Sequence, residues 1–370
     1  MAEIRVERLH KEFQGFVAVQ NSSFVVEDRS FFVMLGPSGC GKTTTLRMIA
    51  GLELPTDGRI LLDGKDVTFK RASGRDIAFV FQLFALYPHM NVRRNIAFPL
   101  VSMGMKRAEV KTRVEEAARI LRITDLLDRP VSGLSGGDRQ RVALGRAIVR
   151  RPMAFMMDEP LGALDSELRD VMCGELRGLH DRLKATTVYV THDQTEAMSL
   201  GDKIAVMSHG VIEQLGTPRE VYDRPATVFV ADFIGSPPMN LLTFNDSLEP
   251  GRGSVRVGQA EIGIPAPREA LTKRDLILGV RPEHVRLSDG ARLRGEVFGT
   301  EYLGTTQIVT ITTAHGMAKA RLAANLKVSI GDAVGLEFRP DRISLFDAGT
   351  GQAIRTALYD HAQAVEHAHV

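Results

Sequence analysis

The spacing of apolar residues changes once along the chain, near residue 235. Before that point, short apolar runs alternate with stretches in which apolar residues recur every three or four positions, the spacing of an amphipathic helix. This alternation predicts an α/β domain with a largely parallel sheet over residues 1–235. In residues 236–370, runs of alternating apolar and polar residues lie between turns rich in glycine and proline. They predict a small all-β domain, either a barrel or a sandwich.

Three segments of the α/β part have especially clear patterns. A helix is predicted over residues 166–184, where leucine and methionine recur at spacings of four and three. Buried strands are predicted over residues 153–157 and 187–191, which are apolar runs that end just before Asp158 and His192. Ligands of open α/β sheets bind beyond the carboxyl ends of the strands. Asp158 and His192 are therefore candidate site residues.

The most specific motif is residues 36–43, Gly-Pro-Ser-Gly-Cys-Gly-Lys-Thr, which fits the pattern G-x-x-x-x-G-K-[ST]. It follows the apolar run 31–35 and precedes a helix-like stretch. Glycines let backbone N–H groups surround a phosphate at a helix N-terminus. Lys42 adds positive charge near the β- and γ-phosphates, and the Thr43 hydroxyl can ligate Mg²⁺. The motif predicts a site for a nucleoside triphosphate.

Two further motifs extend this prediction. Asp158 and Glu159 form an acidic pair at a predicted strand end, where one carboxylate can hold Mg²⁺ and the other can take a proton from an attacking water. Residues 134–137, Leu-Ser-Gly-Gly, precede a helix-like stretch and form a second phosphate cradle. Because one nucleotide hardly needs two cradles from one chain, we expect the second cradle to close on the nucleotide of a partner subunit.

Composition limits the partners and the cellular compartment that the sequence predicts. The chain has 47 basic and 45 acidic residues, interspersed, for a net charge of +2, so no nucleic-acid partner is expected. Two cysteines make no disulfide framework, and a reducing compartment is expected. The N-terminus has no apolar signal region, and no run approaches the ~18 apolar residues of a membrane span. A role at a membrane would need other chains to supply the membrane part.

Taken in order, the motifs resemble those of ABC-transporter ATPase subunits. They are the phosphate loop at 36–43, a glutamine loop around Gln82, the signature at 134–137, the acidic pair at 158–159, residues 161–165, and His192. Within that superfamily, the chain is similar to the ATPase subunits of maltose- and glycerol-phosphate-type carbohydrate importers. This narrower similarity rests on the phosphate loop and on residues 85–89, 191–197, 235–240 and 279–284.

The resemblance implies a fold and a division into domains. Residues 1–235 would form a P-loop NTPase domain of the ABC ATPase type with a helical subdomain. Residues 236–370 would form a small all-β regulatory domain built on an oligonucleotide-binding-like (OB-like) barrel, with a C-terminal tail. In this setting the OB-like fold would serve regulation and dimerisation rather than nucleic-acid binding, because no basic or aromatic stripe supports the latter.

The resemblance also implies the residues of the ATP site. Phe13 would stack on adenine, with Ala18 close by. The phosphates would be wrapped by Gly36, Pro37, Ser38, Gly39, Cys40, Gly41, Lys42, Thr43 and Thr44.

Catalytic roles follow from the same resemblance. Glu159 would be the general base, and His192 would contact the γ-phosphate and sense its presence. Gln82 would complete the environment of the water, and Mg²⁺ would be held by Thr43, Gln82 and Asp158. Residues of the signature would complete the ATP site of the opposite chain, and Asp165 would couple the two sites. The signature residues concerned are Ser135, Gly136 and Gly137.

Several partners are implied as well. They are a second copy of the chain, two transmembrane permease subunits and, indirectly, an extracytoplasmic solute-binding protein. The segment after Gln82 would abut a short helix of the permease. The protein would lie peripherally on the cytoplasmic face of the bacterial inner membrane. Its ATP hydrolysis would energise uptake of a saccharide, polyol, sugar derivative or glycerol phosphate.

Two positions depart from the family pattern. Asp138 stands where relatives usually have glutamine, and a carboxylate that faces a polyphosphate repels it. Because Ser135 and backbone N–H groups contact the phosphate, we expect slower hydrolysis at most. Residues 162–163 are Gly-Ala where relatives commonly have Ser-Asn. Since Asp165 is kept, weaker or altered coupling between the sites is expected rather than its loss.

Cys40 raises a separate hypothesis. Its thiol lies beside Lys42 at a predicted helix N-terminus, a setting that lowers the pKa of a cysteine. We therefore expect an unusually reactive thiol that ATP protects from alkylation.

Two other interpretations stay open at this stage. One is a soluble ABC-type ATPase that acts on nucleic acid or ribosomes, although the chain has one cassette and no basic patch. The other makes the β-rich domain chiefly a sensor of a regulatory ligand or partner. The C-terminal tail with His361, His367 and His369 is expected to be solvated rather than to bind a metal.

Overall fold

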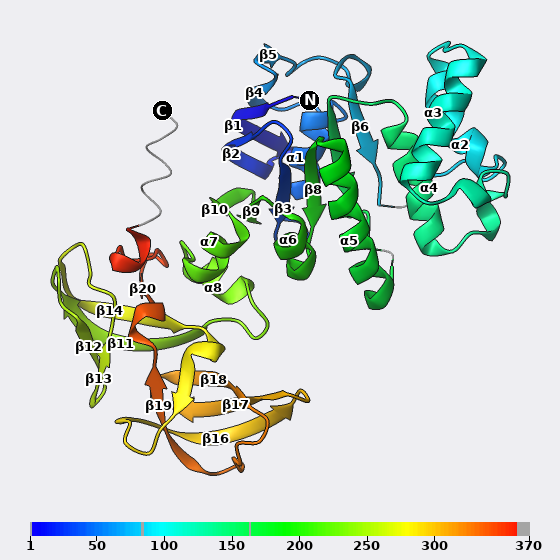
Figure 1. Cartoon of the computed structure of the whole chain (residues 1–370). Helices are drawn as coiled ribbons and strands as arrows, with labels where there is room; N and C mark the ends of the chain where they lie inside the picture. The colour runs from blue at the N-terminus through cyan, green and yellow to red at the C-terminus, as the bar shows by residue number, and fades with distance from the viewer. Residues whose placement is uncertain (1, 83–84, 163, 361–370) are drawn as a thin grey trace. The chain divides into compact units, whose positions relative to one another are not determined.

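The computed structural model describes residues 2–82, 85–162 and 164–360 (Figure 1). The predicted tail with its three histidines and the residue at position 163 thus lie outside the described residues. The chain divides into two compact units, Met1–Pro218 and Arg219–Val370. The sequence pattern instead predicts the division at 235/236. The helices α7 (Pro218–Asp223) and α8 (Val228–Phe233) lie between these two positions.

A six-stranded sheet forms the centre of the first unit. Its strands follow the order β10-β9-β3-β8-β7-β6, and every neighbouring pair is parallel except β10 with β9. Three central strands are buried at every residue, as expected for a parallel sheet covered on both faces. The predicted parallel sheet is confirmed. The strands are β3 (Phe31–Leu35), β6 (Ile77–Val80), β7 (Ala154–Asp158), β8 (Thr186–Thr191), β9 (Lys203–Ser208) and β10 (Val211–Gly216).

A second, antiparallel sheet of the first unit has the order β2-β1-β4-β5. The sequence pattern does not predict this second sheet, because the pattern shows where strands lie but not which strands pair with one another. Gln14 and Gly15 connect its first two strands with φ values of 45° and 88°, as in the tight turns of hairpins. The strands are β1 (Ile4–Phe13), β2 (Phe16–Val26), β4 (Asp57–Leu62) and β5 (Lys65–Asp66).

In the described part of the first unit, six α-helices accompany these sheets. α2, α3 and α4 pack on one another and form a helical group beside β6 in Figure 1. The predicted helix at 166–184 is confirmed as α5. The helices are α1 (Lys42–Ala50), α2 (Val92–Ser102), α3 (Arg107–Ile120), α4 (Gly136–Ile148), α5 (Ser166–Leu183) and α6 (Gln194–Leu200).

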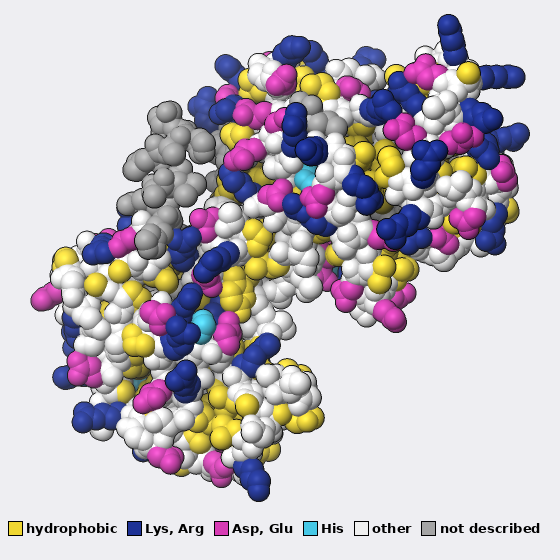
Figure 2. Space-filling view, viewed as in Figure 1, with side chains coloured by type: hydrophobic (Ala, Val, Ile, Leu, Met, Phe, Trp, Pro, Cys, Tyr) yellow, Lys and Arg dark blue, Asp and Glu magenta, His cyan; other side chains and the backbone are white. Residues whose placement is uncertain are grey.

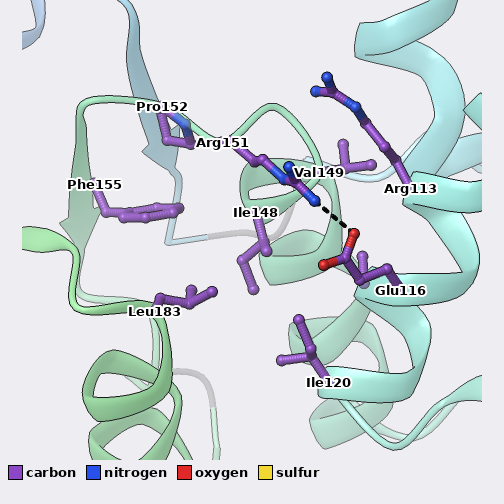
Figure 3. Close-up of a pocket in the computed structure, with 10 residues that line it drawn as sticks. Arg113, Glu116, Ile120, Ile148, Val149, Arg151, Pro152, Phe155 and Leu183 are labelled. Atoms are coloured by element: carbon purple, nitrogen blue, oxygen red, sulfur yellow. Dashed lines mark hydrogen bonds and ion pairs between the residues drawn. The ribbon is translucent and has the colours of Figure 1, made fainter. Parts of the chain in front are cut away.

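An apolar cavity of about 200 Å³ lies where α3, the end of α4, the start of β7 and the end of α5 meet. Figure 3 shows Ile148, Phe155 and Leu183 around it. An ion pair of 2.7 Å between Arg151 and Glu116 joins the α4–β7 connection to α3 at its rim. Both side chains are about half exposed, so this pair contributes little stability.

A buried arginine fixes the end of the helix that follows the phosphate loop. Arg75 is 2% exposed and donates hydrogen bonds to the Met48 and Ile49 carbonyls at the end of α1, at 2.7 and 2.8 Å. Burial lowers the pKa of its guanidinium. The carbonyls of a helix C-terminus lack intrahelical partners, and a cation there is favourable. Arg75 therefore anchors α1 from the end opposite the phosphate loop.

The second unit contains three antiparallel sheets, of orders β11-β14-β20, β12-β13 and β15-β19-β16-β17-β18. They share one buried apolar core, so the prediction of a small all-β domain is confirmed. The strands are β11 (Asn240–Leu248), β12 (Ser254–Val257), β13 (Ala260–Gly263), β14 (Leu271–Val280), β15 (Val285–Leu287), β16 (Leu293–Tyr302), β17 (Thr306–Thr313), β18 (Gly316–Ala323), β19 (Ala333–Phe338) and β20 (Ile343–Asp347).

Arg281 explains why α7 and α8 belong to the second unit. This side chain follows β14 and is 2% exposed. Its guanidinium donates to the carbonyls of Tyr222 at 2.8 Å, of Ala231 at 3.2 Å and of Ile234, and it lies 4.2 Å from the centre of the Tyr222 ring. One buried cation thus ties both helices to the β-rich part. Burial lowers its pKa.

Replacing Arg281 by alanine should destabilise the second unit strongly. The change leaves buried carbonyls without donors, and we expect the free energy of unfolding to fall by roughly 3 kcal/mol. Arg274→Ala is the matched control, because Arg274 makes an exposed ion pair of 2.9 Å with Asp347 and should cost less than about 1 kcal/mol. Urea unfolding followed by far-UV circular dichroism measures both, and equal losses would contradict the role given to Arg281.

Candidate active site

Four parallel strands end at the same edge of the central sheet, and each delivers a predicted site residue there. The phosphate loop follows β3, and Gln82 follows β6. β7 ends in Asp158, and His192 comes directly after β8. Because these strands are parallel neighbours, their carboxyl ends form one edge. This is the edge at which open α/β sheets bind ligands.

Two glycines of the phosphate loop are required by close packing. A Cβ atom on Gly36 would lie 2.2 Å from the Met207 carbonyl oxygen, and one on Gly41 would lie 2.4 Å from the Ala18 carbonyl oxygen. Gly41 also has a φ of +100°, which side chains other than glycine rarely adopt. The loop therefore passes against the backbone of β9 and β2 at a distance that only glycine allows.

Lys42 is held over the phosphate loop. Its side chain is 4% exposed, and its Nζ donates to the carbonyl oxygens of Gly36 at 2.8 Å and Pro37 at 2.9 Å. The residue is also the first of α1, so its charge lies where the backbone N–H groups of that helix start. Together they form a strongly anion-attracting position.

A cavity of about 330 Å³ joins the phosphate loop to the tip of the β1–β2 hairpin. Most of the predicted ATP-binding residues line it, although Gly36, Pro37 and Cys40 do not. Phe16 also lines it and was missed by the sequence analysis. This residue is 64% exposed and is the hairpin partner of Phe13. The lining residues are Phe13, Phe16, Ala18, Ser38, Gly39, Gly41, Lys42, Thr43, Thr44 and Glu159.

Phe13 and Phe16 present aromatic surface at one end of this cavity. Phe13 is 41% exposed, and Lys11 Nζ lies 4.5 Å from its ring centre. The two aromatic residues flank the Gln14-Gly15 turn. This turn is the signal that could have found Phe16, because a two-residue hairpin turn places the residues before and after it side by side.

Asp158 and Thr43 meet beside the phosphate loop. The Thr43 hydroxyl donates to Asp158 Oδ1 at 2.8 Å. Asp158 is 7% exposed, and burial raises the pKa of its carboxyl although the hydrogen bond from Thr43 opposes this. A carboxylate and a hydroxyl are oxygen donors of the kind that Mg²⁺ prefers. The two residues therefore fit a magnesium site.

Glu159 brings together the three residues predicted to be catalytic. Its Oε2 accepts a hydrogen bond of 3.2 Å from Gln82 Nε2 and lies 3.3 Å from His192 Nδ1. The backbone of Glu159 has a φ of +43°, an unfavourable conformation for this residue type. Its N–H donates to the Val190 carbonyl at 3.0 Å, which helps to hold that conformation. Such strain is typical of functional sites.

The signature residues do not line the cavity of this chain. Ser135 caps α4, since its Oγ accepts a hydrogen bond of 3.2 Å from the Asp138 N–H. The same hydroxyl donates to Asp138 Oδ2 at 2.7 Å. The other Asp138 oxygen lies 3.4 Å from Arg141 Nη1. Within one chain, both Asp138 oxygens thus have partners near the start of the same helix, and whether the residue affects the ATP of a second copy stays a prediction.

The first turn of α4 also packs against the start of α5. A Cβ on Gly136 would lie 3.2 Å from the Leu164 side chain, and one on Gly137 would lie 3.3 Å from Leu168. Asp165 caps α5 by accepting a hydrogen bond of 2.9 Å from the Leu168 N–H. The signature and the predicted coupling residue therefore belong to neighbouring helix starts.

The expected lowering of the Cys40 pKa is wrong, because the structure raises this pKa. Its side chain is 3% exposed, and burial raises the pKa of the thiol above 9.0. Lys42 Nζ lies 3.7 Å from the sulfur and lowers that pKa only in part. The sequence shows a neighbouring cation and a helix start, but it does not show that the thiol points into the core.

On the face seen in Figure 2, basic and acidic side chains lie interspersed. Among the helices of the described residues, none is both long and apolar enough to cross a membrane.

The fold and this site define a phosphate-loop ATPase. A model of the ABC transporter family matches residues 19–162, a model of the MalK OB fold domain matches residues 235–285, and one of the TOBE domain matches residues 278–346. The chain belongs to the ABC transporter family as an ATP-binding, ATP-hydrolysing subunit of the import type.

Similar proteins cover nearly the whole chain. The trehalose import ATP-binding protein SugC of Mycobacterium tuberculosis is 45% identical over 95% of this chain and 98% of its own length. The trehalose/maltose import ATP-binding protein MalK of Thermococcus litoralis is 46% identical over 96% of this chain and its own full length (100%). Among solved structures, cbiO1 of Clostridium perfringens, part of an ABC transporter complex, has a TM-score of 0.56 and 28% identity over 59% of this chain and 89% of its own.

Cys40 should react slowly with N-ethylmaleimide. A raised pKa leaves less thiolate at pH 8, so the rate should be below that of free cysteine and should keep rising as the pH passes 9. Bound ATP should slow it further. The Cys173→Ser variant isolates the signal, because Cys173 is the other cysteine, with a pKa raised to about 12 by burial. Labelling at pH 7 faster than that of free cysteine would contradict the prediction.

Proposed function

We propose that this chain is the motor of an importer for a sugar or sugar-like solute. The support comes from its relatives, which are named as import ATP-binding proteins for trehalose, maltose, xylose or arabinose, and sn-glycerol-3-phosphate. A saccharide, a polyol, a sugar derivative and a glycerol phosphate all fit this range. The motor would work with two permease subunits and a solute-binding protein at the bacterial inner membrane, on its cytoplasmic face.

The observation that carries the catalytic proposal is the position of Glu159. This carboxylate lines the cavity of the phosphate loop and lies beside Gln82 and His192. As general base, it takes a proton from the water that attacks the γ-phosphate. Gln82 orients that water, and His192 donates a hydrogen bond toward the γ-phosphate.

The remaining residues bind the substrate. Phe13 stacks on the adenine ring at the hairpin end of the cavity, and Phe16 is a second aromatic surface there. Lys42 pairs with the β- and γ-phosphates, for which it exchanges its loop carbonyl partners. Thr43, Asp158 and Gln82 would hold Mg²⁺, which neutralises charge on the phosphate oxygens when bound.

Hydrolysis is proposed to require two copies of the chain. Ser135, Gly136 and Gly137 lie at a helix start away from the cavity of their own chain, which supports their use on the ATP of a second copy. A structural relative is described as a dimeric bacterial ABC transporter cassette, with a TM-score of 0.53 and 29% identity. ATP would favour the closed dimer because it binds that state better than the open one, and release of phosphate would reopen it.

A groove beside the helical group is the proposed contact for the permease. It has a volume of about 320 Å³ and lies between the end of β6, α2 and α4. Phe81 and Phe98 line it and are 40% and 36% exposed, and the Tyr87 ring lies 4.5 Å from that of Phe98. Apolar surface of this kind fits the apolar face of a short helix. Because Phe81 adjoins Gln82, a helix seated there would contact the catalytic edge.

The β-rich unit is proposed to serve regulation and dimerisation. Its support is the match to the MalK OB fold and TOBE domains. In this role it would add control to the motor rather than replace its function.

Glu159→Gln tests the general base. The amide keeps the size of the side chain but cannot take the proton, so hydrolysis should fall by roughly 10²- to 10⁴-fold while ATP still binds. Single-turnover hydrolysis and nucleotide binding measure the two effects. Near-normal turnover would remove Glu159 as the base.

The same variant tests the importer. Tagged Glu159→Gln protein with ATP should favour the closed dimer and should retain two multi-span permeases from detergent-solubilised native membranes. The protein without ATP is the control. Recovery of soluble partners alone in repeated preparations would contradict an import function.

Asp138→Gln tests the departure from the family pattern. The change removes a negative charge and replaces the carboxylate that accepts from the Ser135 hydroxyl at 2.7 Å with a longer, neutral amide. We expect hydrolysis to stay equal or to rise by a few-fold, because the Ser135 hydroxyl is released from a carboxylate and the helix start proposed to face the ATP of a second copy loses one negative charge. A steady-state ATPase assay measures it, with Asp170→Gln on the exposed start of α5 as the control. A strong fall would show that Asp138 has a positive role.

A further inference from the structure

Two predicted functional segments meet at one arginine that no motif includes. Arg169 lies in the first turn of α5. Its Nη2 donates to the Leu164 carbonyl at 3.0 Å, and its Nη1 donates to Asp193 Oδ2 at 3.1 Å. Leu164 precedes Asp165, the predicted coupling residue, and Asp193 follows His192. The guanidinium thus joins the coupling segment (residues 164–165) to the His192 loop (residues 192–193).

The third partner of Arg169 is a buried carboxylate. Glu196 is 4% exposed, and its Oε1 lies 3.5 Å from Arg169 Nε, an ion-pair contact rather than a hydrogen bond. Its Oε2 accepts hydrogen bonds from the Tyr189 hydroxyl at 2.8 Å and the Thr191 hydroxyl at 2.7 Å, both on β8. Breaking a buried charge pair is costly because one charge is left uncompensated. Glu196 therefore fixes the guanidinium with respect to β8, the strand that ends directly before His192.

Asp193 makes the connection to the His192 loop rigid. Its Oδ1 accepts hydrogen bonds from the N–H groups of Thr195 at 2.7 Å and Glu196 at 3.2 Å, which caps α6. Its other oxygen is bound by Arg169. Both carboxylate oxygens are thus engaged, so the residue next to His192 has little freedom to move independently of α5.

At the other end, the coupling segment is held against the signature helix. The signature helix is α4, which begins at Gly136. The Leu164 side chain packs so close to Gly136 that a Cβ atom there would lie 3.2 Å from it. Its carbonyl is the acceptor for Arg169 Nη2. A displacement of the signature helix thus acts on the side chain of the same residue whose carbonyl is bound to the arginine.

We propose that Arg169 is a positioning residue that transmits movement of the coupling segment to the His192 loop. A planar guanidinium presents its N–H groups in a fixed fork, so that Arg169 can hydrogen-bond to Leu164 and Asp193 while its charge pairs with Glu196. A lysine carries one ammonium and cannot reproduce this geometry. The proposal rests on the proposed roles of Glu159, His192 and the signature. It adds a residue through which engagement of the signature with a second copy would set the position of His192.

The test compares two arginines of the same helix. Arg177 also lies on α5 and donates to the Leu200 carbonyl and to Asp202 Oδ1, both at 2.8 Å. Its side chain is 34% exposed against 27% for Arg169. It ties α5 to the other end of α6 and contacts neither the coupling segment nor the His192 loop. Arg177→Lys is therefore the matched control for Arg169→Lys.

In the full-length protein, Arg169→Lys should lower kcat by roughly 10- to 100-fold, the effect of a small misplacement of a catalytic group. Its KM for ATP should stay within about twofold, because the arginine does not line the ATP cavity. Arg177→Lys should leave kcat and KM within about twofold. Urea unfolding of both variants measures their stability. If kcat falls equally in the two variants, or falls only in proportion to stability, the proposal is overturned.

A double-mutant cycle with Asp193→Asn provides a second measurement. The amide keeps an oxygen that can cap α6 but removes the charge that faces Arg169. If the two residues act as a unit, the double variant should be no slower than the slower single variant. Effects on kcat that multiply would show independent action and would overturn the proposal. Wild type and Glu159→Gln are measured in parallel. Hydrolysis retained by Glu159→Gln would refute the catalytic proposal, whereas its loss alongside an unaffected Arg169→Lys would refute only this inference.

Discussion

The burial of the central strands determines where chemistry can occur in this protein. β3, β7 and β8 are buried along their full length, so polar side chains can be solvated only where these strands end. Parallel pairing brings those ends to one edge. The strand ends therefore bring residues that are distant in sequence within hydrogen-bonding distance. Thr43 of the phosphate loop contacts Asp158, and His192 contacts Glu159. The site is a consequence of the sheet rather than of any one loop.

Three arginines, two of them buried, hold segments of the two units in place. Arg75 binds the end of α1, Arg169 binds the coupling segment and the His192 loop, and Arg281 binds α7 and α8. Arg75 and Arg281 donate to backbone carbonyls of segments that are distant in sequence, whereas Arg169 binds the Leu164 carbonyl and pairs with two carboxylates. An arginine can do this because its five N–H donors point in several fixed directions.

The sequence predicts the parts of this structure that depend on local patterns. The phosphate loop, the acidic pair and helix 166–184 have spacings that identify them without their neighbours. The parts that depend on distant contacts were not predicted. Phe16 is recognisable only once the β1–β2 hairpin is formed, and the contacts of Arg281 with α7 and α8 join segments about 50 residues apart. The pKa of Cys40 was misjudged because burial, which outweighs the nearby Lys42, is a property of the folded chain. Arg169 belongs to no motif, and its three partners come from two other segments.

The left-handed backbone at Glu159 has a consequence for the evolution of this site. A φ of +43° costs a glutamate on the order of 1–3 kcal/mol, whereas asparagine and glycine tolerate it better. At this position, selection for stability alone would therefore favour residues that cannot act as a base. The chain keeps a glutamate in this unfavourable conformation directly after β7, and the rest of the molecule must be stable enough to offset its cost. Under selection for thermal stability alone, random mutagenesis should for this reason replace Glu159 by residues that cannot act as a base earlier than it replaces other residues between β7 and α5.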